Sequence, residues 1–435
     1  MVVTSQVLRK VSLRLIPFIL LCYVVSFLDR VNVGFAGLQM NQDLGLTATQ
    51  FGFGSAIFFL GYCLFEVPSN VILARVGARR WIARIMISWG LLAAALVFTQ
   101  GPISFSVLRF LLGAAEAGFF PGIIYFLTFW YPNAARARAI AAFMIGIPLS
   151  GVIGGPLSGA LLGLDGSLGL SGWQWLYLVE GIPAVILGFI VLGYLTDQPK
   201  DARWLAPEER AALVEVMAAD AAERGDAEKH RIRDALLNPS VWRLGAIPLL
   251  ANTGYYGYII WSPQLIKSFL NSSNWVVGLV SGTIAALMAI SMLANGVHSD
   301  RTRERRLHVA LPLFVMVVGF IASALLPSPT LSIGALALVP IGMGAFFAPF
   351  YSLSCGFLSG EAAAAGIALV VALANVGGLI GPYLIGFLKD ATGGYVVPLL
   401  VLGGIVFLAA VLALRLPADR PIGDGVGESE AAAAR

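Results

Sequence analysis

The sequence predicts an all-α membrane protein, with twelve transmembrane helices in two pseudo-symmetric six-helix halves. First, the chain of 435 residues is 58% hydrophobic and only 12% charged, whereas soluble domains are about 45–50% apolar and about 25% charged. Second, apolar stretches of about 20 residues, enough to cross a bilayer, recur along the whole chain. Third, motifs of the first half return in the second half. This composition excludes an ordinary soluble enzyme, a disordered chain and a nucleic-acid-binding protein.

Hydropathy and loop charge together define the order and orientation of the helices. Basic residues are concentrated in alternate loops, so the positive-inside rule places both termini in the cytoplasm and requires an even number of spans. The expected units are a first half at 1–195, a cytoplasmic linker at 196–240, a second half at 241–416 and a cytoplasmic tail at 417–435. In the linker, Pro207 followed by two glutamates favours the start of a helix. The expected spans are 14–36, 50–73, 82–98, 103–127, 137–163, 173–195, 241–266, 275–297, 307–326, 330–354, 361–386 and 393–415.

An internal repeat relates the two halves at a nearly constant separation of about 226 residues. Gly155-Pro156 parallels Gly381-Pro382, and Gly118-Phe119-Phe120 parallels Ala345-Phe346-Phe347. The segment 70–80, after the second span, parallels 296–306, after the eighth. Parallel six-plus-six repeats are typical of secondary transporters, which bind substrate near the membrane midplane between the halves.

The basic segments after the second and eighth spans resemble the signature loop of the major facilitator superfamily. We expect them to form gating loops, and the residues concerned are Arg75, Gly77, Arg79 and Arg80 in the first copy and Gly296, Asp300 and Arg301 in the second. The first copy has Ala74 where the family pattern often has an acid, which weakens an inner-gate salt bridge there. Three further runs, at 27–34, 66–70 and 109–118, resemble the anion:cation symporter family, which includes bacterial tartrate, sugar-acid and aromatic-acid permeases.

Ionisable residues inside the spans mark the candidate site, because each costs on the order of 3 kcal/mol in a membrane and so requires a partner or water. Asp29 and Arg30 lie in the first span, and Arg109 and Glu116 lie in the fourth. Arg109 and Glu116 are seven residues apart, which places them on one helix face about 10 Å apart. Asp29 and Arg109 have similar expected depths, so we expect an arginine and an acid to pair when substrate is absent.

These residue types suit the binding of an anion together with protons. A guanidinium matches a carboxylate with a rigid fork of donors. Burial favours a neutral carboxyl group and a nearby arginine favours the ionised form, so an acid that loses its arginine to an arriving anion becomes easier to protonate. Substrate and proton then favour each other's binding, as symport requires. The three histidines, His230, His298 and His308, lie in loops or at span ends, which argues against a histidine relay.

The family resemblance assigns roles to the individual residues. It implies that Asp29 and Glu116 couple protons, and that Arg30, Arg109 and Tyr62 contact the substrate. Asn375, in the eleventh span, is a further substrate-binding candidate. The alternatives are structural: Asp29 and Arg30 as a pair within the helix bundle, Tyr62 as packing, and Asn375 as a hydrogen bond between helices.

The sequence therefore favours a multi-pass transporter of the bacterial inner membrane that imports a small carboxylate by proton symport and alternating access. Tartrate or a sugar acid is the favoured substrate class. The alternatives are an aromatic-acid:proton symporter and a proton-coupled exporter of metabolites or drugs. We expect no enzyme activity, no cofactor or metal, and protons as the coupling ion. The expected partners are the substrate and the lipid bilayer, with no nucleic acid, and the expected oligomeric state is a monomer.

Overall fold

The computed structural model describes residues 2–223, 239–357 and 363–416, and within these ranges the chain is helical, without β-strands. The predicted all-α fold is confirmed. The predicted tail at 417–435, part of the linker and His230 lie outside the described residues. The main helices are α1 (Val2–Asp43), α2 (Ala48–Val76), α3 (Ala78–Ala95), α4 (Pro102–Glu116), α5 (Phe119–Thr128), α6 (Asn133–Met144), α7 (Gly146–Leu161), α8 (Gly172–Tyr194), α9 (Pro207–Glu223), α11 (Pro239–Leu270), α12 (Asn274–Thr302), α13 (Arg306–Leu325), α14 (Pro329–Phe357), α15 (Ala363–Thr392) and α16 (Val396–Leu414).

Eleven segments of the described chain are long and apolar enough to cross a membrane. The remaining predicted span corresponds to α11, whose middle contains Asn252, Thr253 and several tyrosines. This helix is enclosed by protein, since Trp261 is fully buried and Tyr255 is 3% exposed. A helix shielded from lipid by its neighbours can carry polar residues that a lipid-facing helix cannot. The twelve predicted spans are therefore all present as helices.

The fourth predicted span, 103–127, is confirmed as a segment long and apolar enough to cross a membrane, Pro102–Thr128, but it consists of two helices. It divides into α4 and α5 directly after Glu116, where Ala117 has an extended ψ of 132° and Gly118 is left-handed with φ of 87°. A left-handed residue ends a helix, and glycine adopts that conformation without steric cost. The short apolar residues at the break leave the hydropathy of the span unchanged, so hydropathy cannot detect it. The fifth predicted span likewise divides into α6 and α7 at Ile145.

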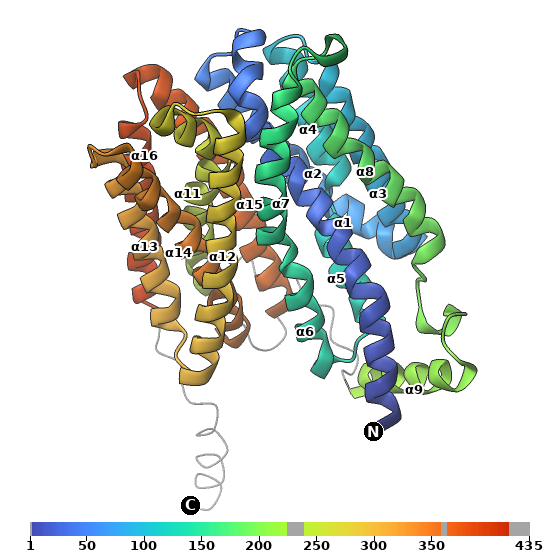
Figure 1. Ribbon diagram of the computed structural model, residues 1–435. Helices are drawn as coiled ribbons and strands as arrows, with labels where there is room; N and C mark the ends of the chain where they lie inside the picture. The colour runs from blue at the N-terminus through green and yellow to red at the C-terminus, as the bar shows by residue number, and fades with distance from the viewer. Residues whose placement is uncertain (1, 224–238, 358–362, 417–435) are drawn as a thin grey trace, which may run out of the picture.

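The helices form two groups that lie side by side (Figure 1). In the first group α3 packs on α8 and α2 packs on α4, and in the second group α11 packs on α15 while α13 packs on α14 and α16. The groups meet where α2 contacts α15, α7 contacts α12 and α1 contacts α11. The start of α1 lies beside α9, to which it is joined by an ion pair between Lys10 and Glu209. We call the end of the molecule that carries the start of α1 and helix α9 the terminal end, and the opposite end the far end.

Glycines allow the two groups to approach closely near the far end. A Cβ atom added at Gly34 of α1 would lie 2.5 Å from the carbonyl oxygen of Ile260 in α11. One added at Gly278 of α12 would lie 2.4 Å from the carbonyl oxygen of Gly155 in α7. Gly34 follows Arg30 toward the end of α1, and Gly278 is in the first turns of α12. Backbones of the two groups therefore touch on the far side of the candidate site.

A carboxylate adds a polar contact between the groups at the far end. Asp390, near the end of α15, accepts hydrogen bonds from the first amides of α2, at 3.2 Å from Ala48 N and 2.7 Å from Thr49 N. It also accepts one from the Thr49 hydroxyl at 2.6 Å. The exposed amides at the start of a helix carry a partial positive charge, which a carboxylate stabilises. One half thus caps a helix of the other.

Candidate substrate and proton site

Asp29 and Arg30 point to different neighbours because consecutive helix residues are rotated by about 100°. Asp29 is 1% exposed and lies against α3, where its carboxylate accepts a hydrogen bond from Trp89 Nε1 at 2.8 Å. Its other oxygen accepts one from Asn32 Nδ2 at 3.2 Å. Arg30 turns instead toward α4. Asp29 and Arg30 therefore do not form a pair with each other, in contrast to the structural alternative.

The arginine–acid pair joins Arg30 to Glu116. Arg30 Nη2 lies 2.7 Å from Glu116 Oε1, and Arg30 Nε donates to the same oxygen at 2.9 Å. The Ser26 hydroxyl donates to it at 2.8 Å. The Glu116 side chain is fully buried, whereas the Arg30 side chain is 12% exposed. The expected similarity in depth of Asp29 and Arg109 suggested a different pair, and no ion pair links those two in the described structure.

Arg109 is the second buried guanidinium and has unused donors. It is fully buried, and its Nε and Nη1 atoms have no hydrogen-bond partner within the described chain. Its Cζ atom lies 4.7 Å from the centre of the Phe58 ring, and Arg30 Cζ lies 5.7 Å from the same centre. Phe58 therefore contacts both guanidinium groups. Unpartnered buried donors on a cation are costly, and an anion bound here would satisfy them.

Close packing of α2 on α4 brings Tyr62 into this site. A Cβ atom added at Gly113 would lie 2.0 Å from the carbonyl oxygen of Phe58, so only glycine permits this approach. Tyr62, one turn after Phe58, is 4% exposed, and its ring centre lies 4.9 Å from Arg30 Cζ. Tyr62 therefore lies next to an arginine of the site, and its contact with the substrate stays a prediction.

The second half contributes aromatic side chains. Tyr256 of α11 lies within hydrogen-bonding reach of Arg30, and its ring centre is 4.5 Å from that of Phe59. Asn375 is half-buried on α15, one turn before Gly378, which packs against Phe59. No hydrogen bond joins Asn375 to the charged side chains of the site in the described structure. Its predicted role in substrate binding stays a prediction.

One buried acid, Glu180, was not among the predicted site residues. It lies in the middle of α8, is 2% exposed and accepts a hydrogen bond from the Ser158 hydroxyl at 2.9 Å. Its second carboxylate oxygen, Oε2, has no partner within the described chain. The signal was present in the sequence, since a glutamate inside the apolar span 173–195 is as unfavourable as Asp29 or Glu116.

The segments predicted as gating loops are largely helical. Arg75 ends α2, and Arg79 and Arg80 lie in the first turn of α3, so only Gly77, with φ of 96°, separates the two helices. The two helices can follow each other so closely because glycine adopts the positive φ of this turn without steric cost. In the second copy, Gly296, Asp300 and Arg301 all lie within α12.

An acid absent from the first signature segment is supplied from elsewhere in the chain. Asp197, which follows α8, accepts a hydrogen bond from Arg79 N at 2.7 Å, and its carboxylate lies 4.0 Å from Arg79 Nε. In the second copy the acid is local, because Asp300 lies 2.9 Å from Arg305 Nη2. Although Ala74 leaves the first copy without an acid of its own, Arg79 thus contacts a carboxylate from the segment that follows α8.

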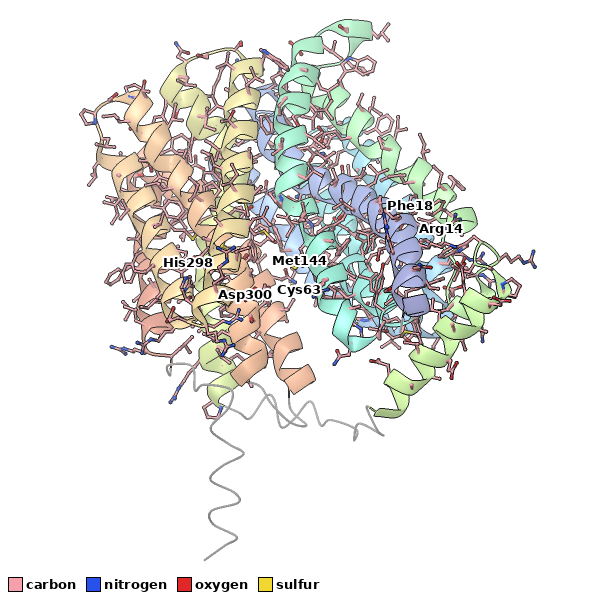
Figure 2. All side chains as sticks on the ribbon, turned by 60° about the horizontal axis from the view of Figure 1, so that its bottom comes forward. Arg14, Phe18, Cys63, Met144, His298 and Asp300 are labelled. Carbon is pink, nitrogen blue, oxygen red and sulfur yellow. The ribbon has the colours of Figure 1, made fainter. Side chains whose placement is uncertain are left out.

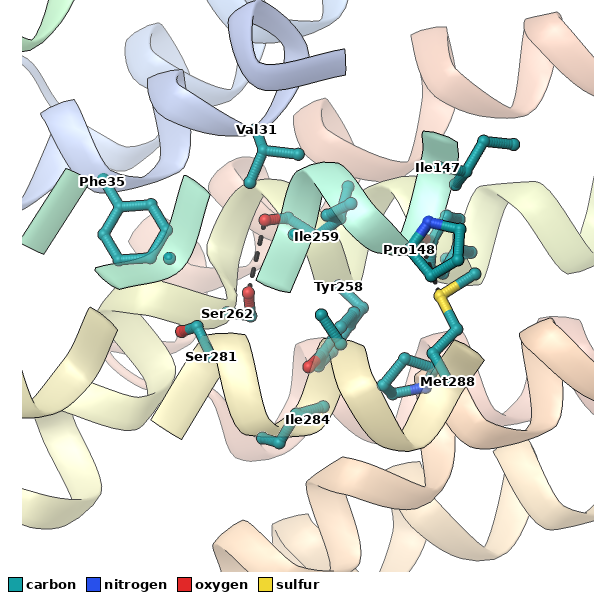
Figure 3. A pocket seen from close by; sticks show the side chains of 15 residues that line it. Val31, Phe35, Ile147, Pro148, Tyr258, Ile259, Ser262, Ser281, Ile284 and Met288 are labelled. Carbon is teal, nitrogen blue, oxygen red and sulfur yellow. Dashed lines mark hydrogen bonds between the residues drawn. The ribbon is translucent and has the colours of Figure 1, made fainter. Parts of the chain in front are cut away.

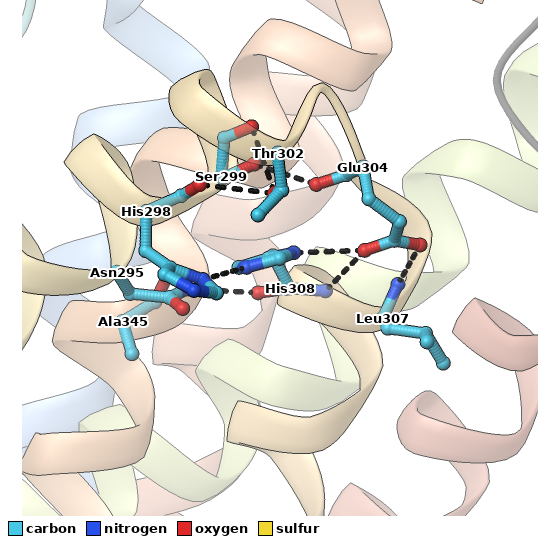
Figure 4. Close-up of polar contacts among 8 residues, drawn as sticks. All are labelled: Asn295, His298, Ser299, Thr302, Glu304, Leu307, His308 and Ala345. Atoms are coloured by element: carbon cyan, nitrogen blue, oxygen red, sulfur yellow. Dashed lines mark hydrogen bonds and ion pairs between the residues drawn. The ribbon is translucent and has the colours of Figure 1, made fainter.

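Two histidines form a polar cluster where α12 ends and α13 begins (Figure 4). His298 Nδ1 lies 2.6 Å from His308 Nε2, and His308 Nδ1 lies 2.8 Å from Glu304 Oε2. Partial burial raises the pKa of Glu304, but hydrogen bonds from the Leu307 and His308 amides and from the His308 ring outweigh it, so the net pKa is lowered. The cluster connects the end of α12 to the start of α13, as expected for histidines at span ends.

A separate, mainly apolar cavity of about 50 Å³ lies between α1, α7, α11, α12 and α14 (Figure 3). Tyr255 and Tyr258 face this cavity, whereas Tyr256 faces Arg30. Seen from the terminal end, Cys63 and Met144 lie in the region where the two halves face each other (Figure 2). The tyrosines of α11 thus serve two different surroundings.

Two bundles of long apolar helices, with paired charges buried near their junction, define a membrane transporter. Residues 19–365 match the model of the Major Facilitator Superfamily, and the chain belongs to this superfamily. It is a membrane transporter and not an enzyme. The bilayer is therefore its surroundings, as predicted.

Similarities to individual proteins extend over nearly the whole chain. The chain is 46% identical to an Agrobacterium vitis protein whose name gives it as a tartrate transporter, over 96% of this chain and 92% of that protein. It is 38% identical to a protein of Acinetobacter baumannii named a quinolone resistance transporter, over 94% and 93% of the two chains. Its fold is similar to the inward-facing, occupied structure of a bacterial homologue of the human lysosomal transporter Spinster. The TM-score is 0.75 at 18% identity, covering 92% of this chain and 95% of the other.

Proposed function

We propose that this protein is a secondary active transporter that imports a small organic acid anion of tartrate or sugar-acid type together with protons. The observation that carries the proposal is the ion pair between Arg30 and Glu116 beside Arg109, whose Nε and Nη1 atoms lack partners. Two guanidinium groups around one phenyl ring offer donors to the two ends of a dicarboxylate, or to a carboxylate and a hydroxyl group. No metal or cofactor takes part in this mechanism, and protons are the coupling ion.

Competition for the arginines couples the substrate to protons. A substrate carboxylate that binds Arg30 displaces Glu116, which leaves a fully buried acid without its cation. An unpaired buried carboxylate is costly, so Glu116 binds a proton. When the substrate also engages Arg109, Asp29 loses the compensating charge of that guanidinium and binds a proton for the same reason. Each ligand therefore raises the affinity for the other, which is reciprocal coupling.

The contacts between the halves support alternating access. Backbone contacts at Gly34 and Gly278 and the cap formed by Asp390 join the halves at the far end. With the termini assigned to the cytoplasm by loop charge, this state is closed to the outside. Separation of the far-end contacts and approach of the terminal ends would expose the same site to the other side. We also propose that the two signature segments act as gates. The transporter is proposed to be a monomer in the bacterial inner membrane.

The substrate class follows from the groups around the arginines. The hydroxyl groups of Tyr62 and Tyr256 suit a polar, hydroxylated anion, and the similarity to a protein named a tartrate transporter supports this class. An aromatic acid is the alternative within the same mechanism, because Phe58 contacts both guanidinium groups. A proton-coupled exporter is a second candidate, favoured by the similarity to a protein named a quinolone resistance transporter. Two arginines inside the helix bundle, Arg30 and Arg109, favour the binding of an anion over that of a cationic drug.

Uptake into proteoliposomes tests the proposal. Labelled tartrate, sugar acids, aromatic acids and a quinolone are offered with and without an inward proton gradient, to the wild type and to Glu116→Gln. We expect gradient-driven accumulation of one hydroxy or sugar acid that the substitution abolishes, while counterflow exchange persists. Glu208→Gln on the surface helix α9 is the control and should behave as the wild type. Accumulation that depends on neither the gradient nor Glu116, or transport of the quinolone alone, would contradict proton symport of an acid.

A further inference from the structure

The buried charges of the first half do not balance. Three carboxyl groups, of Asp29, Glu116 and Glu180, are at most 2% exposed, and within the described residues the arginines beside them are Arg109, fully buried, and Arg30, 12% exposed. If every group were ionised, the region would carry a net charge of minus one. An uncompensated charge inside a membrane protein is costly, so one of the three acids holds a proton in the state without substrate.

The contacts of each acid identify which one holds that proton. Glu116 is paired with Arg30 at 2.7 Å. Asp29 accepts hydrogen bonds from two N–H groups, of Trp89 and Asn32. Glu180 accepts a hydrogen bond from the Ser158 hydroxyl, the Asn32 side chain lies within reach of it, and its Oε2 atom has no partner within the described chain. Glu180 is therefore the acid whose ionised form is stabilised least.

The helix register places Glu180 on the far-end side of Asp29. Trp173 Nε1 donates to Asp43 Oδ2 at 2.8 Å, which aligns the start of α8 with the end of α1. From that level Glu180 lies about 10 Å into the bundle and Asp29 about 21 Å, at 1.5 Å of rise per helix residue. Asn32 lies one turn beyond Asp29 in the same direction and reaches both acids. Asn32 Oδ1 and Glu180 Oε2 are both buried acceptors without a partner.

We propose that Glu180 is a proton-relay residue that supplies Asp29 from the outer side during transport. The proposal rests on the proton symport proposed above. When an anion engages Arg109, the O–H bond of Glu180 breaks and an O–H bond forms on Asp29, past the free Asn32 oxygen. Glu180 is left as a carboxylate and is reprotonated by water from outside once the far end opens. The relay thus connects Glu180, which does not contact the substrate, to Asp29, whose proton affinity changes when the substrate binds Arg109.

The charged and titratable groups around Glu180 fit this order of events. Asp29 on α1 is close enough to Glu180 to interact electrostatically. Tyr177, one turn earlier on α8 itself, interacts with both acids and with Arg109. On α7 the polar contact of Glu180 is the neutral Ser158. Arg109 interacts with Glu116 and Asp29, so its neutralisation by substrate raises the proton affinity of Asp29 more than that of Glu180. The proton therefore moves toward Asp29.

Transport kinetics test the relay with Glu180→Gln and Glu180→Asp. We expect Glu180→Gln to slow gradient-driven uptake by about 100-fold, the low end for a lost proton-transfer group, and to flatten its dependence on external pH. Counterflow exchange, which needs no net proton transfer, should stay close to the wild-type rate. Glu180→Asp keeps a carboxyl group and should restore part of the uptake. Equal loss of counterflow and uptake in Glu180→Gln would mean a structural role, and wild-type uptake in that variant would overturn the relay.

Infrared spectroscopy of the purified protein gives a readout that does not depend on transport. A neutral carboxyl group has a carbonyl stretching band distinct from that of a carboxylate. We expect one such band in the wild type at neutral pH, lost in Glu180→Gln, shifted in frequency in Glu180→Asp and kept in the surface variant Glu208→Gln. A band that survives Glu180→Gln overturns the proposal whatever the substrate. If the band behaves as expected while the wild type shows no gradient-driven uptake, symport fails and the relay fails with it, whereas the protonation of Glu180 stands.

Discussion

The two halves share a helix arrangement and differ in what they bury. The first half contains the buried Asp29, Arg109, Glu116 and Glu180, whereas no Asp, Glu, Lys or Arg is buried in the described part of the second half. There, α11 buries three tyrosines, and Tyr256 is the one that reaches Arg30. The two copies of the repeat thus share the helix arrangement, whereas the buried charged residues of the described structure lie in the first copy alone. The first half supplies charge and proton binding, and the second half supplies a shaped, neutral wall.

The same difference is present in the backbone. Gly118 in the first half corresponds to Ala345 in the second, by the repeat. The chain breaks at Gly118 directly after Glu116, whereas α14 runs without interruption through Ala345. The break places the acid at the last position of α4. A helix end near the midplane is tolerated only where protein or water satisfies its free carbonyl groups, so the irregular backbone coincides with the charged half.

Arg109→Lys should have the largest effect if charge in the first half dominates binding. Lysine keeps the charge but loses the planar fork of donors, of which Nε and Nη1 are unpartnered in the described structure. We expect affinity for the acid to fall about 30-fold, which corresponds to about 2 kcal/mol for hydrogen bonds to a charged group. Binding is measured by displacement of labelled substrate in detergent.

Arg84→Lys is the matched control for this substitution. Arg84 is an arginine of α3 that is half-buried and stacks on Trp81 at 3.9 Å. We expect its affinity to stay within about twofold of the wild type. Equal affinities in Arg109→Lys and the wild type would show that the site needs only a positive charge there, and would remove the argument from guanidinium geometry.

Gly118→Ala tests whether the backbone break is needed, with an expected effect of intermediate size. A Cβ atom at this position would lie 2.4 Å from Ser69 Oγ, and the φ of 87° is strained for alanine. Left-handed geometry costs roughly 1–2 kcal/mol outside glycine, so we expect a lower thermal unfolding midpoint and slower uptake. Gly404→Ala in α16, where open space surrounds the position, should change neither. An unchanged midpoint and uptake rate in Gly118→Ala would show that α4 can continue through the break.

The sequence predicted which residues carry charge into the membrane but not which of them pair. Asp29, Arg30, Arg109 and Glu116 were identifiable because a charge in an apolar span is unfavourable unless it has a function. Their partners depend on helix rotation and on the approach of α2 to α4 at Gly113, which a linear pattern does not encode. The acid Asp197 that serves Arg79 lies in a different connecting segment, so spacing along the chain could not find it. Glu180, in contrast, gave the same signal as the other acids and was overlooked.

Tyr256→Phe should have the smallest effect and decides how passive the second half is. The change removes one hydroxyl group within reach of Arg30 and keeps the ring that packs on Phe59. One neutral hydrogen bond contributes about 0.5–1 kcal/mol, so we expect affinity for a hydroxylated acid to fall about two- to fivefold. The affinity is measured in the same displacement assay.

Tyr255→Phe is the control that separates this contact from aromatic packing in general. The Tyr255 hydroxyl donates to Met288 Sδ at 3.5 Å, beside the apolar cavity and on a different face of α11 from Tyr256. Its removal should leave affinity unchanged. A loss in Tyr256→Phe that reaches the loss in Arg109→Lys would contradict the division of labour between the halves. It would show that the neutral wall selects the substrate as strongly as the arginines hold it, and that specificity arises from both copies of the repeat.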